Sequence, residues 1–491
     1  MNHLFFKKTY LLILIYSLNV AATSDSIASD NIFYLNKENI INEAKNNSAA
    51  IENIKAQFLA SKLDKSQYLE DFQPNLTADA KYFKTNERNF IEYAPVVSPI
   101  SNFSIGAKKN FVSGFSFGLY NNIEKRKYDK FGSDAYNYVS IEFTMDLYKN
   151  LFGKNSKSRI SYLKYQEDLA KIQKEIDTEV FLILVFRKYL EILLNHEAIK
   201  ISQQILENYK VQEMDMKRRY KDGVADLSDV KRSSSQISTQ NVNILNLLNK
   251  EELLFLDLRN LLPSISGKNI KISDYDMKNY DNYFSRIISI ISSNNSVPLN
   301  YTKYDDVIKI LYKSYKKEMN FTNNYDDLDL EFYSSYNHFG NNSTNKKALQ
   351  DLNKDPRVSY ETGLRLNIPL GNKKTDSKDT MILAQKSAFL AKKRQDMAKI
   401  ESYHLQSISN IAILRKSQKF QRQNSGNLKE ISMLSEKKYK QARISIRDLI
   451  DDQDLYFQSI LKELEIKAIV INQILDYMII FTKTPFALSD G

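Results

Sequence analysis

Several short segments of the chain alternate between apolar and polar residues, which is the period-two pattern of a β-strand with one apolar face. The clearest is residues 138–148, where the apolar positions are Val139, Ile141, Phe143, Met145 and Leu147. The polar positions between them are Ser140, Glu142, Thr144 and Asp146. Similar alternation occurs at residues 115–119, 328–332 and 358–370. The pattern predicts a few strands in two groups, one in each half of the chain.

The period changes directly after the first group of strands. Gly153 and Asn155 mark a turn, and apolar residues then recur every seven positions, with others at the three–four spacing of a helical seam: Tyr162, Tyr165, Leu169, Ile172 and Ile176. Neither Pro nor Gly occurs from residue 154 to 222. The sequence therefore predicts one helix of about 100 Å. Gly223 ends it, and a return helix is predicted at 227–262, before Pro263.

The second half of the chain repeats this order, which indicates an internal duplication. Each half begins with a short helix, predicted at 38–70 and at 304–319, the first ending before Pro74. The second half then has a turn at Gly371 and Asn372, followed by a long helix at 376–441 and a return helix at 445–481. The spacing from the turn glycine to the tyrosine near the end of each long helix differs by one residue between the halves.

The predicted organisation follows from these breaks. It comprises a signal peptide at 1–22, a first repeat at 23–262, an equatorial segment between the repeats at 263–283, a second repeat at 284–482 and a C-terminal tail at 483–491. The signal peptide rests on Lys7 and Lys8, followed by a short apolar run and a small residue, Ala22, at the expected cleavage point. An N-terminal membrane anchor is the alternative. The polar, turn-prone residues 341–356 predict a loop.

Composition narrows the possible functions. The chain has 491 residues, and its net charge is +11, but Lys and Arg alternate with Asp and Glu, as on solvated helix faces. This arrangement of charges, together with the predicted signal peptide, argues against a nucleic-acid partner. The absence of Cys excludes disulfides, thiolate metal sites and a lipid-modified N-terminal cysteine.

Signals for catalysis are weak. Only four His occur, and His196 and His404 have no second His at metal-binding spacing. The sequence contains no G-x-S-x-G, P-loop or dinucleotide-binding motif. We therefore expect no enzyme, no cofactor and no metal site.

The alternating segments are too few to bury both of their faces within one chain. A β-barrel closed between several copies would solve this, with the apolar face toward lipid and the polar face toward water. A small β-sandwich that caps a coiled coil is the alternative. The expected fold class is thus mainly α with a transmembrane β portion, built from two repeats of strands and long coiled-coil helices.

The chain resembles the TolC-like outer-membrane efflux protein family. The resemblance is carried by the duplicated order, the strand-to-helix passages at 146–153 and 367–371, and the turn Tyr220-x-x-Gly223-x-x-x-x-x-Asp229. It implies a homotrimer in which an α-barrel is continuous with a shared twelve-stranded β-barrel, four strands coming from each chain. Residues 74–150 are longer than residues 328–371, which departs from the simplest family pattern and leaves room for an additional hairpin or a long outer loop.

The resemblance also implies the function. The protein would be a passive channel-tunnel across the periplasm and outer membrane of a Gram-negative bacterium, in an efflux pump or a type I secretion system. Its partners would be a periplasmic adaptor (membrane fusion) protein, an inner-membrane transporter and outer-membrane lipid. Two alternatives are a soluble periplasmic coiled-coil adaptor or interaction protein, and an extracellular helical rod. Known adaptors have one helical hairpin flanked by β-domains, whereas this chain has two hairpins.

By the same resemblance, the two helix turns at 220–230 and 439–449 would form the periplasmic entrance. The family pattern of the second turn has a Tyr, a Gly, an Arg two residues later and two Asp further on. Tyr439, Asp448 and Asp451 match it, whereas Ala442 replaces the Gly and Ile444 the Arg, with Arg443 one place earlier. The residues expected at the entrance or constriction are Asp448, Asp451, Tyr439, Arg443, Tyr220 and Asp229. Those expected where an adaptor docks are Gly223, Ser228 and Ala442.

Each of these residues also has a simpler interpretation. Asp448 and Asp451 would form rings of carboxylates that attract cations, or would be ordinary acidic residues at a helix N-terminus. Tyr220 and Tyr439 would hold the entrance closed by hydrogen bonds, or would merely pack. Gly223 would admit an adaptor helix, or would simply end its own helix in a left-handed conformation.

Overall fold

The computed structural model describes residues 32–87, 97–128, 132–273, 275, 277–293, 302–322, 328–354, 357–368 and 372–481. The predicted signal peptide, the C-terminal tail and the turn residue Gly371 lie outside these residues. The chain divides into two compact units, each containing parts of both predicted repeats. Among the described residues, the hairpin unit comprises 32–52, Val180–Ile290 and Asn410–Leu475. The described part of the strand unit comprises Asn53–Glu179, Ile291–Ser409 and 476–481.

The long helices begin and end close to where the sequence places them. They are α5 (Lys154–Lys221) with its return helix α6 (Leu227–Leu261), and α10 (Asn372–Lys440) with its return helix α11 (Ile446–Phe481). The predicted short helix at 304–319 is also confirmed, as α8 (Lys303–Thr322). Among the described residues, no helix combines the length and apolar content needed to cross a membrane.

The single helix predicted at 38–70 is wrong, because three helices occupy this segment: α2 (Lys37–Asn47), α3 (Ala49–Ala60) and α4 (Leu63–Glu70). Ser48 interrupts the first pair, with an extended backbone. Its hydroxyl accepts a hydrogen bond from the Ala50 N–H at 3.2 Å, which favours the start of a new helix. Neither Gly nor Pro marks this break, so the sequence pattern missed it.

In the hairpin unit, each long helix packs against its own return helix. The Asn195 amide of α5 donates to the Leu247 carbonyl of α6 at 2.9 Å, and the Gln421 amide of α10 donates to the Ser459 carbonyl of α11 at 2.9 Å. The core of this unit includes residues of α5 that are fully buried, namely Val185, Phe186, Tyr189, Ile192 and Leu193. Burial of this apolar area is the main stabilising contribution to the unit.

The equatorial segment is more ordered than the sequence suggests. It contains a 3-10 turn (Pro263–Ile265), strand β6 (Asn269–Ile272) and the start of helix α7 (Met277–Ser293). Strand β6 pairs in parallel with β1 (Ile32–Leu35), which brings the start of the described chain beside the segment between the predicted repeats. The Tyr280 hydroxyl of α7 is hydrogen-bonded at 2.8 Å to the hydroxyl of Tyr189 in α5.

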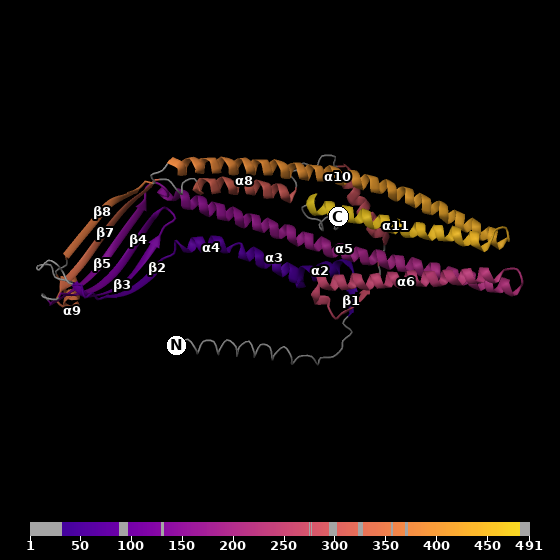
Figure 1. Ribbon diagram of the computed structural model, residues 1–491, viewed down its shortest axis with the longest axis horizontal. Helices are drawn as coiled ribbons and strands as arrows, with labels where there is room; N and C mark the ends of the chain where they lie inside the picture. Colours follow the sequence, from indigo (N-terminus) through magenta and orange to yellow (C-terminus); the bar gives the residue numbers. More distant parts are fainter. Residues whose placement is uncertain are drawn as a thin grey trace, which may run out of the picture. The chain divides into compact units, whose positions relative to one another are not determined.

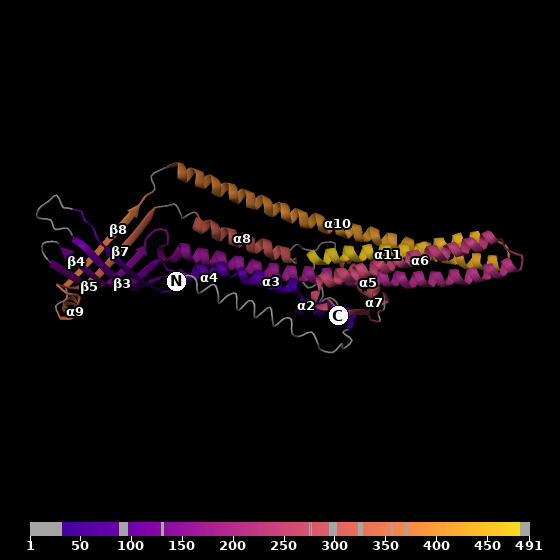
Figure 2. The same cartoon turned by 60° about the horizontal axis from the view of Figure 1, so that its bottom comes forward.

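The strand unit contains one antiparallel sheet of six strands (Figures 1 and 2). Its order is β2 (Asn75–Phe83), β3 (Val97–Asn110), β4 (Phe115–Tyr128), β5 (Gly132–Asp146), β7 (Asp329–Asn342) and β8 (Arg357–Asn367). The expectation of four strands per chain is therefore wrong. The first half of the chain supplies four strands by itself, and its greater length is the extra hairpin that the sequence left room for. Strands β2 and β8 are the two edges.

The pairing register divides the sheet into one apolar and one polar face. Leu119 faces Ile141, Ile141 faces Tyr336, and Tyr336 faces Tyr360 across four neighbouring strands. Residues at the alternate positions form the polar face, where Arg365 and Glu331 make an ion pair at 3.0 Å. Strands β4, β5, β7 and β8 thus keep the alternation predicted from the sequence, and the pairing register joins their apolar sides into one continuous surface.

Helix α9 (Asn345–Lys354) replaces the loop predicted at 341–356. Its Ala348 and Leu352 side chains are buried against the sheet, and the His338 imidazole of β7 lies 3.2 Å from the Leu352 carbonyl oxygen. Gly340 allows the close approach, since a Cβ there would collide with the Ala348 carbonyl oxygen. Within this unit, α9 lies at the end of the sheet remote from α4 and α8 (Figures 1 and 2).

At the other end of the sheet, a tight corner joins β5 to α5. The Asn150 side-chain oxygen accepts hydrogen bonds from the N–H groups of Asn155 and Ser156, at 3.1 and 2.9 Å, and so caps the helix. Gly114 and Gly153 have positive φ angles of 87° and 78°. A Cβ at Gly153 would collide with the Val112 carbonyl oxygen, so the corner closes only with glycine there.

Candidate entrance site at the two helix turns

The first turn ends α5 at Lys221 and begins α6 at Leu227. Gly223 has a φ of 76°, and the Val224 N–H donates to the Arg219 carbonyl at 2.8 Å, which is the hydrogen bond of a left-handed helix end. A Cβ at Gly223 would meet no atom within 4 Å. The backbone conformation rather than lack of space therefore favours glycine, in agreement with the simpler interpretation of this residue.

The second turn has the same backbone geometry although it lacks the glycine. The Arg443 N–H donates to the Lys438 carbonyl at 2.9 Å, and Ala442 has a φ of 54°. Ala442 thus occupies the conformation that Gly223 adopts in the first turn. This conformation costs an L-residue about 1–2 kcal/mol, so the contacts around the turn must stabilise it.

Asp448 is held by a capping box at the start of α11. Its carboxylate accepts hydrogen bonds from the Ser445 N–H at 3.1 Å and the Ser445 hydroxyl at 2.7 Å. The Asp448 N–H donates back to the Ser445 oxygen at 3.2 Å. These hydrogen bonds lower the pKa of Asp448 below its ordinary value. In the structure, Asp448 therefore has the ordinary role of an acidic residue at a helix N-terminus, and its carboxylate stays charged and exposed.

Beneath the turns lies a small buried core made from all four long helices. It contains Met216 of α5, Val230 of α6, Tyr439 of α10, and Ile446, Leu449 and Ile450 of α11. Ala225 and Ile444 pack against it from the two turns. Ile444 is the residue that stands where the family pattern has Arg. In this protein an isoleucine therefore makes an apolar contact where the family pattern places an arginine.

Tyr439 and Tyr220 are not equivalent, although the sequence places them alike. Tyr439 is 8% exposed and Tyr220 is 45% exposed. The Arg219 guanidinium lies over the Tyr439 ring, 4.4 Å from its centre, and donates to the Asp215 carboxylate at 2.9 Å. Burial raises the pKa of the Tyr439 hydroxyl. The packing interpretation fits Tyr439, and the sequence pattern missed Arg219 and Asp215 as its partners.

A second polar cluster joins three helices in the hairpin unit. Tyr209 of α5 donates a hydrogen bond to Asp454 of α11, and the Gln236 amide of α6 donates to the same carboxylate at 2.9 Å. Burial raises the pKa of Asp454. As a residue type in a run of acidic side chains, Asp454 does not stand out from its exposed neighbour Asp451. Only the heptad position, which points Asp454 into the bundle, could have distinguished them.

The remaining predicted site residues lie at the surface. Arg443 and Ser228 are exposed, and Asp451 is exposed with the Arg447 guanidinium nitrogen 3.9 Å from its carboxylate. Asp229 is half-buried and its negative charge acts on Tyr439. The structure therefore brings Tyr439 and Asp229 together but leaves Tyr220, Arg443, Asp448 and Asp451 facing solvent.

Two histidines of the long helices, His196 and His404, lie close to other polar side chains. The His196 Nδ1 atom lies 2.9 Å from the Glu251 carboxylate, and the His404 Nδ1 atom lies 3.2 Å from the Tyr477 hydroxyl. Burial lowers the pKa of His404. Over the described part of the chain, no group of three or more His, Asp or Glu side chains could hold a metal ion.

Comparison with known proteins shows the fold. No family model and no curated protein matches the chain. A solved structure of CusC, described in terms of transmembrane channel formation, superposes with a TM-score of 0.66 at 11% identity and covers 94% of this chain and 95% of its own. The outer membrane protein VceC of Vibrio cholerae gives 0.64 at 11% identity, covering 90% and 95%. The CmeC outer membrane channel of Campylobacter jejuni also gives 0.64 at 11% identity, covering 91% and 85%.

Proposed function

We propose that the chain, which has the fold of the TolC-like outer-membrane channels that its sequence resembles, is one subunit of a passive export channel. It would reside in the outer membrane of a Gram-negative bacterium, extend into the periplasm, and serve an efflux pump or a type I secretion system. One observation carries the proposal: the same chain that forms two long helical hairpins also forms an amphipathic sheet with two open edges.

The open edges favour a ring of copies. Strands β2 and β8 are exposed along almost their whole length. The backbone N–H and C=O groups on their outer edges are therefore available to pair with another strand. The sheet has six strands, and each runs antiparallel to its neighbour, so the first and last strands run in opposite directions. When copies form a ring, β8 of one copy is therefore antiparallel to β2 of the next, and the antiparallel pairing continues around the ring. Three copies would contribute eighteen strands instead of twelve. Barrels of 16–18 strands enclose an aqueous channel.

The apolar face argues against the alternative of a soluble adaptor. Phe103, Leu119 and Leu364 are exposed on this face and belong to one continuous surface. A water-soluble protein rarely leaves so large an apolar surface uncovered. In the proposed channel this face contacts lipid, and the polar face with Glu142 and Arg365 lines the water-filled interior.

The partners follow from the same proposal. The helix turns around Gly223, Ser228 and Ala442 would contact a periplasmic adaptor, which would connect the channel to an inner-membrane transporter. Exposure of these three residues leaves them accessible to such a partner. The export of a substrate needs no catalytic group in this chain, because the energy would come from the transporter.

Cysteine cross-linking tests the ring directly, since the chain has no Cys of its own. We expect Ala78→Cys in β2, combined in turn with Tyr360→Cys, Thr362→Cys or Leu364→Cys in β8, to give a disulfide between copies for at least one pair. The covalent product should stop at a trimer and should fractionate with membranes.

The matched control is Asp79→Cys with the same three partners, because Asp79 lies on the opposite face of β2. Its cross-linking should be much weaker. A water-soluble monomer in the absence of detergent, or cross-linked polymers of open-ended length, would overturn the proposed function.

We also propose that the exposed carboxylates form a cation-binding constriction in the assembled entrance. Asp448→Asn combined with Asp451→Asn should weaken the block of single-channel current by divalent cations several-fold, because like charges brought together by symmetry attract cations. Planar-bilayer recordings measure this. Ser445→Ala is the control, since it removes the capping partner of Asp448 but keeps both charges. Unchanged block in the double variant would remove these residues from the role.

A further inference from the structure

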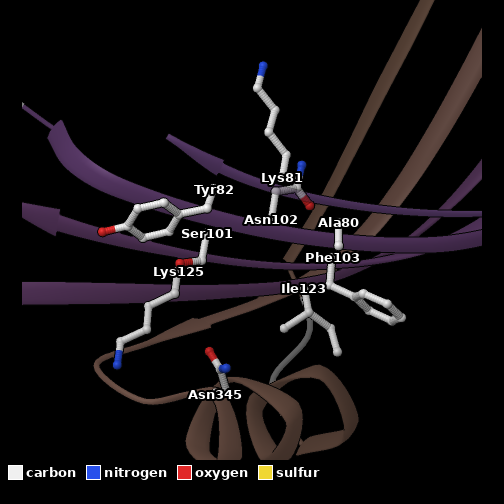
Figure 3. A pocket seen from close by; sticks show the side chains of 9 residues that line it. All are labelled: Ala80, Lys81, Tyr82, Ser101, Asn102, Phe103, Ile123, Lys125 and Asn345. Atoms are coloured by element: carbon white, nitrogen blue, oxygen red, sulfur yellow. The ribbon is translucent and has the colours of Figure 1, made fainter. Parts of the chain in front are cut away.

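A pocket of about 370 Å³ lies on the apolar face of the sheet, beside the first residue of α9 (Figure 3). Its size falls within the range of about 300–1,000 Å³ typical of small-ligand sites. Strands β2, β3 and β4 form its floor, and Asn345 of α9 contributes to its wall. The pocket does not belong to the entrance site, because every residue that lines it is in the strand unit.

The pairing register arranges the pocket in two rows. Ala80, Phe103 and Ile123 face one another across the three strands and form an apolar row. Tyr82, Ser101 and Lys125 form the next row, which is polar. Figure 3 shows Lys125 and Asn345 on one side of the strands and Lys81 on the other. The pocket is therefore apolar along one row, whereas the other row carries one ammonium group and two hydroxyls, and α9 adds an amide.

The surroundings of the polar row are positively charged. Lys127 lies two residues after Lys125 in β4, on the same face, and α9 carries three lysines of its own: Lys346, Lys347 and Lys354. One carboxylate, Asp351, belongs to α9, and it accepts a hydrogen bond from the Asn342 amide at 2.8 Å. This end of the apolar face thus combines a hydrophobic surface with a local excess of cations.

We propose that the pocket binds a phosphate-bearing lipid of the membrane leaflet that surrounds this end of the sheet. The acyl chains would lie against Phe103 and Ile123, and the phosphate would contact Lys125, with the Asn345 amide and the Tyr82 hydroxyl as further hydrogen-bond donors. The inference rests on the proposed function, because only a membrane-embedded sheet places this face in lipid.

Charge and polarity together favour a lipid over a soluble anion. A soluble phosphate would gain little from the apolar row, whereas a lipid uses both rows at once. Lysines at the boundary of an apolar band also attract anionic headgroups, and tyrosine is enriched at such boundaries. The order from the apolar row to the polar row and then to the lysines of α9 matches the order from acyl chain to headgroup.

Native mass spectrometry of the purified full chain tests the inference, with lipid A as the phosphate-bearing probe and its dephosphorylated form as the comparison. Lys125→Gln combined with Lys346→Gln and Lys347→Gln should lower the retention of lipid A by about fivefold or more. Lys108→Gln is the matched control, because it removes a positive charge from the opposite face of the same sheet and does not line the pocket, and retention should stay at the level of the unmodified protein.

A fluorescence measurement gives a second readout, because the chain has no Trp. Tyr82→Trp places a single indole at the pocket, and its emission should shift on addition of lipid A but not of inorganic phosphate. Equal retention of the dephosphorylated lipid, equal loss in Lys108→Gln, or an equal response to inorganic phosphate would each overturn the proposal.

Recordings on the same variants separate this inference from the proposed function. If the lysine variants insert into planar bilayers and conduct normally but retain lipid A like the unmodified protein, the lipid site is wrong and the channel stands. If the unmodified protein does not insert into bilayers, the proposed function fails, and the lipid site fails with it.

Discussion

Replacing Tyr439 by Ala should open the entrance of the assembled channel and raise its single-channel conductance. Tyr439 is buried in the small core beneath the two turns, which also contains residues of α5, α6 and α11. Removing a buried aromatic side chain typically costs about 3–5 kcal/mol. The loss would fall on the contacts that hold the four long helices together at this point. Planar-bilayer conductance, with thermal unfolding of the hairpin unit in the full chain, measures the effect.

Two variants identify the cause of that effect. Tyr439→Phe keeps the ring under the Arg219 guanidinium and loses only the hydroxyl, whose contact with the Met216 sulfur is 3.8 Å long. It should cost about 1 kcal/mol or less. Tyr220→Ala should change little, since that side chain is already exposed. If Tyr220→Ala raised the conductance as much as Tyr439→Ala, the buried core would not explain the closed entrance. Equivalent contacts of the two tyrosines would then be the explanation.

Replacing Gly153 by Ala should nearly abolish the assembled channel. The left-handed backbone at this corner costs an alanine about 1–2 kcal/mol, and the collision of its Cβ with the Val112 carbonyl adds to that cost. The obstructing atom is backbone, so no change of rotamer relieves it. The corner joins β5 to α5, and a shift there would displace the sheet from its helix. The amount of heat-resistant oligomer in membranes reports the loss.

Gly223→Ala is the matched control for this prediction. Gly223 has nearly the same φ, 76° against 78°, but a Cβ there meets no atom within 4 Å. It should therefore cost only the conformational strain of about 1–2 kcal/mol, and the oligomer should still form. Equal damage from the two substitutions would show that backbone conformation, and not the collision at the corner, limits assembly.

At the candidate site, the sequence predicts the positions of the two turns but not the contacts of the residues around them. The sequence located both turns, because glycine and the change of period are local signals. It could not rank Tyr220 and Tyr439, because both stand at the same place before a turn. It also gave Asp448 a role in the entrance without finding the capping partner Ser445, three residues earlier, which was visible in the sequence as a Ser-x-x-Asp pattern.

The long helices, their ends, the repeated order and the alternating faces of β4, β5, β7 and β8 could be predicted from local patterns along the chain. These depend on periodicity and on breaks within a few residues. Three features became visible only in the folded chain: the six-stranded sheet, the placement of α9 on its apolar face and the burial of Tyr439 beside Arg219. Burial and strand pairing depend on partners that lie far away in the chain, so local patterns do not set them. A residue's own neighbours in sequence set its conformation, but they do not determine which distant surface covers it.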